Sequence, residues 1–173
     1  MTRAISMLVC ALALLAAACG AASAGPTGPP GISYGRDICI ECGMSIDDVR
    51  FAAAYRLDDG TEKGFDDVGG LVVHDRKFGG LAGATVWVHD FETEHWILAV
   101  EAYFLPTRGV ASPMGHGILA FADEGRATRA AADLGSDVIR WDVVQQLPII
   151  DGRVGHHHAE DANMTDNKEG AQP

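Results

Sequence analysis

The chain has 173 residues, a formal net charge of −11 at pH 7 and a hydrophobic content of 47%. That length fits one ordinary domain or two very small units that share a core. The negative charge disfavours nucleic acid and anionic lipid as partners, and it favours a cationic ligand or a basic protein partner.

Residues 1–19 have the layout of a secretory signal peptide. One positive charge, Arg3, precedes an apolar run that small residues follow. The run is shorter than the roughly 20 residues that a membrane-spanning helix needs. Residues 15–20, Leu-Ala-Ala-Ala-Cys-Gly, are similar to a bacterial lipobox. We therefore expect lipidation of Cys19 and a lipid anchor on the outer face of the cell membrane. Cleavage after Ala24, which would give a soluble periplasmic protein, is the alternative.

Two stretches of biased composition flank the middle of the chain. Residues 20–35 are rich in Gly, Pro and small residues, which is typical of a flexible tether. Residues 151–173 carry five acids against two bases and almost no large apolar side chain, so we expect an acidic disordered tail. The run His156 to His158 in that tail is suited to loose metal binding, although a solvated tail without a role is the simpler interpretation.

The first folded unit is expected over residues 36–92. Alternating apolar residues and an Asp-Gly turn predict a hairpin, and an acid-started apolar pattern predicts a helix. The expected strands are 51–57, 61–65 and 85–89, and the expected helix is 66–76.

The second unit is expected over residues 93–150 and repeats this order. Its expected strands are 96–105, 118–121 and 138–141, its helix is 123–134, and a last helical turn lies at 143–147. Gly135 provides the stop signal of the helix. Both units have the order strand, strand, helix, strand, so we predict an α+β fold of two ββαβ units in tandem.

Sulfur-containing residues form the most informative pattern. Cys39, Cys42 and Met44 fall within six residues, and Met114 and His116 form a second group about 70 residues later. Thiolate, thioether and imidazole are ligands suited to Cu(I). Both methionines lie beside glycine in loop-like sequence, outside any apolar periodicity, which argues against simple core packing. The sequence therefore predicts an exported Cu(I)-binding protein.

Other interpretations of the Cys39–Cys42 pair stay open. A redox disulfide is expected at a strand-to-helix junction, whereas this motif precedes the first strand. Structural zinc needs four N or S ligands, and no second pair follows nearby. The pair could also serve a thiol oxidoreductase, a lyase that cleaves carbon–metal bonds with help from Asp47, or a stabilising disulfide in an adaptor. His116 could be a loop residue without a partner, and His74, His89 and His95 are expected on the surface.

Five motifs in this order resemble the NosL family, the nitrous oxide reductase accessory lipoproteins. They are Cys42-Gly43-Met44, Phe65 to Leu71 (FDDVGGL), Val88 to Phe91 (VHDF), Pro113-Met114-Gly115 and Ile118 to Phe121 (ILAF). The resemblance implies two ββαβ units related to part of organomercurial lyase, and a Cu(I) chaperone, not an enzyme, whose client is nitrous oxide reductase. It also implies that Cys42 and Met114 are the main copper ligands, with His116 or Cys39 as the third.

Overall fold

The computed structural model describes residues 27–150 and 153–154. The predicted signal peptide, the lipidation site Cys19 and His156 to His158 lie outside the described residues. Within the described residues, no helix combines the length and the apolar character that crossing a bilayer requires.

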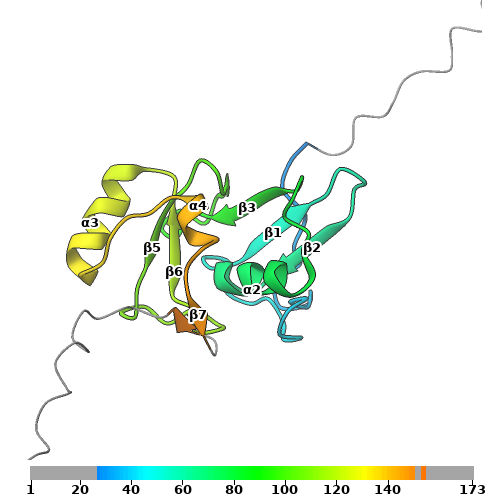
Figure 1. The fold of residues 1–173 in the computed structure, drawn as a ribbon, viewed down its shortest axis with the longest axis horizontal. Helices are drawn as coiled ribbons and strands as arrows, with labels where there is room; N and C mark the ends of the chain where they lie inside the picture. The colour runs from blue at the N-terminus through cyan, green and yellow to red at the C-terminus, as the bar shows by residue number, and fades with distance from the viewer. Residues whose placement is uncertain (1–26, 151–152, 155–173) are drawn as a thin grey trace, which may run out of the picture.

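A four-stranded antiparallel sheet forms the first half of the fold. Its strands have the order β2-β1-β3-β4 and are β1 (Ala53–Arg56), β2 (Glu62–Phe65), β3 (Thr85–His89) and β4 (Trp96–Leu98). The predicted Asp-Gly turn joins β1 to β2, with Gly60 at φ 86°. Helix α2 (Val68–Phe78) follows β2 and contacts β1, β2 and β6, so it lies between the two halves (Figure 1).

The second half is built on a two-stranded sheet of β5 (Tyr103–Pro106) and β6 (Ile118–Phe121), with helix α3 (Glu124–Leu134) packed against it. Gly135 ends α3 in the left-handed conformation, as predicted. The remaining elements are the short helix α4 (Trp141–Val144) and a small hairpin of β7 (Ile149–Ile150) and β8 (Arg153–Val154).

The mixed helix-and-sheet class is confirmed, but the second unit is not the complete ββαβ unit predicted. The single strand expected over 96–105 is two strands, because β4 pairs with β3 in the first sheet and the chain turns before β5. The strand expected over 138–141 is reduced to one bridge, Ile139 to Phe104. Trp141 instead begins α4, where its ring packs against Phe104 at a centroid distance of 5.6 Å.

The N-terminal end of the described chain packs closer than a flexible tether would. Ile32 and Tyr34 lie against the main core cluster. The Tyr34 hydroxyl is 2.5 Å from Nε2 of His89, whose ring also stacks near Trp96 with centroids 3.7 Å apart. The surface position predicted for His89 is therefore wrong, because its two ring nitrogens are engaged by Tyr34 and the Glu94 carbonyl.

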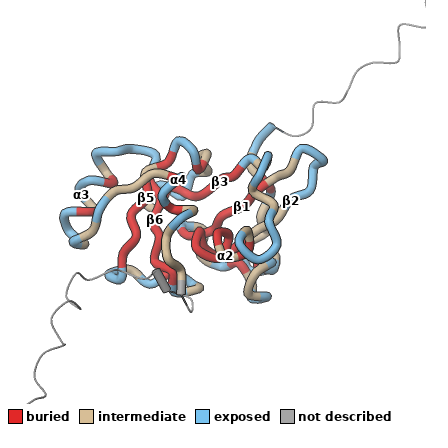
Figure 2. Tube along the Cα trace, viewed as in Figure 1, coloured by how far each residue is buried: buried red, intermediate tan, exposed pale blue. Residues whose placement is uncertain are grey.

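Two clusters make up the core. The larger one joins the inner face of the first sheet, α2 and side chains from β5, β6 and α4. The smaller one lies between the β5-β6 sheet and α3. Figure 2 shows buried chain running through α2 and the central strands, while α3 is largely exposed on its outer side. The N-terminal half of α2 is thus surrounded by both halves of the fold.

Asp90 connects the two halves electrostatically. It is fully buried, and its carboxylate accepts hydrogen bonds from Arg126 at 2.8 and 2.7 Å and from the backbone N–H of Ala122 at 2.7 Å. Burial alone would raise the pKa of this carboxyl, but these donors, led by Arg126, outweigh burial and hold the pKa well below its usual range. The turn after β3 is therefore tied to the start of α3.

We predict that Asp90→Asn lowers the free energy of unfolding by about 3 kcal/mol at pH 7, because it leaves Arg126 without its buried charge partner. A depressed carboxyl pKa stabilises the fold above the unfolded-state pKa of about 4, and this contribution fades as the pH falls further. Urea unfolding should therefore show a gap between the two proteins that is constant from pH 7 to about pH 4 and shrinks below it.

Glu92→Gln is the matched control, because Glu92 contacts the same Arg126 from a side chain that is 49% exposed. Its cost should stay within about 1 kcal/mol. Equal losses in the two variants would contradict the role given to Asp90.

Candidate metal site

The segment Cys39 to Met44 forms a tight loop. Ile38 and Ser45 pair as an isolated antiparallel bridge at its base. Inside it, the Cys39 N–H donates to the Met44 carbonyl at 2.8 Å and the Gly43 N–H donates to the Cys39 carbonyl at 2.9 Å. Gly43 has φ 74°, a conformation that favours glycine. The loop therefore holds both cysteines in a fixed local geometry.

Glu41 attaches this loop to helix α2. Its carboxylate lies 3.2 Å from Nδ1 of His74 and also contacts the Lys77 ammonium. His74 is buried, so the surface position predicted for it is wrong. The ring contacts Phe65 and Phe78 as well as the acid. His95, by contrast, is exposed, as predicted.

Both cysteines are free thiols, and they are hydrogen bonded to each other. Cys39 is buried in the main core cluster, whereas Cys42 is half-buried at its edge. Burial raises the pKa of the Cys42 thiol to about 11, and Cys39 and the charge of Asp66 act in the same direction. A thiol nucleophile needs a lowered pKa, so the electrostatics of Cys42 favour neither the oxidoreductase nor the lyase interpretation. A cation that binds this thiol at neutral pH has to displace its proton.

The negative charge of Asp66 acts on the Cys42 thiol. Asp66 is 3% exposed, and its Oδ1 atom has no hydrogen-bond partner among the described residues. Burial raises the pKa of the Asp66 carboxyl, although the backbone N–H of Asp47 works against this. Buried oxygens are normally paired, so an orphaned oxygen close to Cys42 fits a site that receives a cation.

The Met114 loop approaches the same helix from the second half of the fold. An added Cβ atom at Gly70 would lie 2.4 Å from Sδ of Met114, and one at Gly69 would lie 2.2 Å from Cγ of His116. Both side chains therefore rest directly on the backbone of the first turn of α2. Met114 is half-buried and packs against the main core cluster, and His116 is buried.

Asp67 fixes this arrangement. It is the N-cap of α2, where its Oδ1 accepts from the Gly70 N–H at 2.8 Å and lies 2.7 Å from Nδ1 of His116. Its Oδ2 accepts from the Ser112 hydroxyl at 2.6 Å. Burial opposes ionisation, but the hydrogen bonds, led by that from His116, hold the pKa of the Asp67 carboxyl below its usual range. In the neutral tautomer that donates Nδ1–H to Asp67, Nε2 of His116 carries a lone pair.

Helix α2 contacts both sulfur groups predicted from the sequence, at different turns. The Cys39–Cys42 loop is attached to its later turns through Glu41, whereas Met114 and His116 lie on its first turn. The charge of Asp66, next to the N-cap, acts on the Cys42 thiol. Met44 is 52% exposed, and its backbone N–H, a donor to the Cys42 sulfur, makes its contact with that thiol. In the part of the chain that the structure describes, no three His, Cys, Asp or Glu side chains gather as a metal-binding group.

Sequence reasoning missed Asp66, Asp67, Gly69 and Gly70 as parts of the site. The acids were assigned only to the start of a helix. The available signal was the pair of adjacent glycines in the first turn of a helix, a position where glycine is unfavourable without a packing reason.

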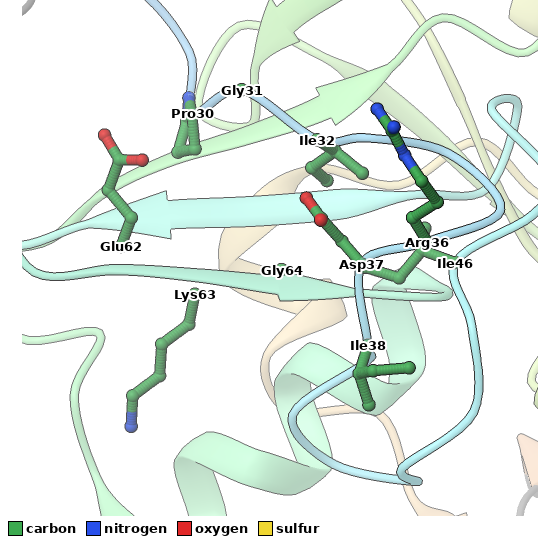
Figure 3. Close-up of a pocket in the computed structure, with 10 residues that line it drawn as sticks. All are labelled: Pro30, Gly31, Ile32, Arg36, Asp37, Ile38, Ile46, Glu62, Lys63 and Gly64. Carbon is green, nitrogen blue, oxygen red and sulfur yellow. The ribbon is translucent and has the colours of Figure 1, made fainter.

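A groove of about 470 Å³ lies beside the cysteine loop. Figure 3 shows it between the segment of Pro30, Gly31 and Ile32 and the strand that carries Lys63 and Gly64. Ile38 lines it, but none of the sulfur residues does. The sulfur residues therefore lie outside this groove.

Two comparisons with known proteins cover this part of the chain. A sequence profile of NosL matches residues 34–147, which include both sulfur loops and α2. The chain belongs to the NosL family. The crystal structure of the copper chaperone NosL from Shewanella denitrificans is similar, with a TM-score of 0.59, 22% identity, and coverage of 68% of this chain and 95% of that one. This likeness shows that the NosL fold is shared. No curated protein gives a significant match.

For this NosL family member we predict that Asp67→Ala lowers the free energy of unfolding by at least about 3 kcal/mol, since it removes a helix cap and leaves two further buried groups unpaired. Asp123→Ala is the matched control, because Asp123 caps α3 through the Arg126 N–H alone and is exposed. Its cost should be about 1 kcal/mol. Similar urea midpoints for the two variants would show that Asp67 is only a cap.

Proposed function

We propose that this chain is an exported Cu(I) chaperone. The observation that carries the proposal is that two segments far apart in sequence meet α2. Met114 lies on its first turn, and the charge of Asp66, next to its N-cap, acts on the Cys42 thiol. A thiol and a thioether are a soft donor set that suits Cu(I) better than harder cations. The description of the Shewanella denitrificans neighbour as a copper chaperone supports the same assignment.

Copper is cargo in this proposal, and the chain's own residues hold it. The Cys42 thiol gives up its proton and binds as thiolate, whereas the Met114 thioether binds without proton loss. His116 through Nε2, or Cys39 beside Cys42, is the proposed third donor. Met44 is the weakest candidate, because its exposed side chain makes no core contact that would fix it.

Release follows from the same features. A low coordination number at a half-buried loop lets the ligands of a recipient attack before those of the donor leave. The net charge of −11 favours a client with a basic docking patch. We propose nitrous oxide reductase as that client, for maturation of its copper-sulfide centre. We also propose a lipid anchor at Cys19 that holds the chaperone at the outer face of the cell membrane or in the periplasm.

An anaerobic Cu(I) titration against a chromophoric chelator tests the assignment. We expect one tightly bound Cu(I) in the full chain. Cys42→Ala and Met114→Ala should each weaken binding by more than the roughly 10–100-fold that loss of an outer-shell partner costs. Met44→Ala is the matched control, and its effect should stay below about tenfold. Unchanged affinity in either ligand variant would refute the assignment.

The raised pKa of the Cys42 thiol, about 11, predicts a steep pH dependence. Below that pKa the bound cation displaces one proton, so the affinity should rise about tenfold for each pH unit between pH 6 and pH 9. Chelator competition at several pH values measures this slope. A flat profile would mean that copper binds without the Cys42 thiolate.

A further inference from the structure

Gly70 supports the Met114 thioether. A Cβ atom at position 70 would lie 2.4 Å from Sδ and 3.0 Å from Cε of Met114. Carbon and sulfur atoms that are not bonded do not approach this closely. With Met114 in its observed place, any residue other than glycine is therefore excluded at position 70.

The backbone gives no other reason for a glycine there. Gly70 is the third residue of α2 and is not among the glycines with positive φ. In a helix, glycine is about 1 kcal/mol less favourable than alanine. Gly70 therefore makes the helix less stable than alanine would, and it allows Met114 to approach the helix backbone closely.

Gly69 and Gly70 differ in the kind of atom that an added Cβ would meet. An added Cβ at position 69 would meet Cβ and Cγ of His116 at 2.4 and 2.2 Å, atoms close to the backbone that cannot move independently. At position 70 the conflict is with the far end of a flexible side chain. Alanine at 69 would therefore disturb the fold, whereas alanine at 70 can be accommodated if Met114 swings away.

We infer that Gly70 is a positioning residue for the Met114 thioether, an inference that rests on the proposed Cu(I) site. The missing side chain lets the sulfur settle against the first turn of α2, beside the capped end that Asp67 holds. The helix thereby fixes one donor before the cation arrives. Part of the affinity comes from this preorganisation, because a donor held loosely by about 1 Å weakens a site.

The test compares Gly70→Ala, Met114→Ala and the double variant with the full wild-type chain. Gly125→Ala is the matched control, because Gly125 lies in the first turn of α3 and an added Cβ there meets only Asp123 and Arg129 side-chain atoms at 3.3 and 3.5 Å. Cu(I) affinity is measured by chelator competition. The ¹³C-labelled methionine methyl signals are recorded on the metal-free proteins.

We expect Gly70→Ala to stay folded, to shift the Met114 methyl signal but not that of Met44, and to lose about 10–100-fold in Cu(I) affinity. In a chain that already carries Met114→Ala, adding Gly70→Ala should cause no further loss of Cu(I) affinity, because the thioether that alanine at position 70 would displace is absent. The inference would be overturned if Gly70→Ala bound Cu(I) with wild-type affinity. It would also be overturned if Gly70→Ala lowered the Cu(I) affinity of Met114→Ala by the same factor as it lowers that of the wild type. A wild-type chain that binds no Cu(I) would refute the proposed function instead, and an unmoved Met114 methyl signal would still overturn the positioning role.

Discussion

The carboxylate of Asp67 is the interaction on which the rest of the site depends. A buried charge is tolerable only when its lone pairs are satisfied, and here the donors come from both halves of the fold. The Gly70 N–H belongs to the helix that Asp67 caps, whereas Ser112 and His116 belong to the distant Met114 loop. The Asp67 carboxylate therefore caps α2, holds the Met114 loop in place and orients the His116 ring.

Helix α2 extends this constraint to the other sulfur loop. Its first turn carries the contacts to Met114, and its later turns hold Glu41 through His74 and Lys77. Both loops are therefore positioned by their contacts with the same helix. Both cysteines of the described chain are free, and Cys42 lies half-buried at the edge of the core.

Much of the fold could be predicted from periodicity, because β1, β2, β3, α2 and α3 follow local apolar patterns and acid-started helices. The prediction failed where tertiary pairing overrides local pattern. The apolar run 96–105 looks continuous, yet its first part completes the first sheet and its second part starts another. His74 and His89 were misplaced for a similar reason, since only the fold supplies the acid, hydroxyl and rings that surround them. The soft donors were visible in the sequence, but their support on Asp67 and Gly70 depends on a contact between halves.

The central claim is that Cys42 and Met114 bind the same cation at the start of α2. Selenomethionine labelling of the full chain, followed by copper-edge X-ray absorption of the Cu(I)-loaded protein, tests it most directly. The account predicts a selenium neighbour of copper that disappears in Met114→Leu and persists in Met44→Leu, together with a sulfur neighbour that Cys42→Ala removes. Bound copper without a selenium neighbour in the wild-type chain would contradict it.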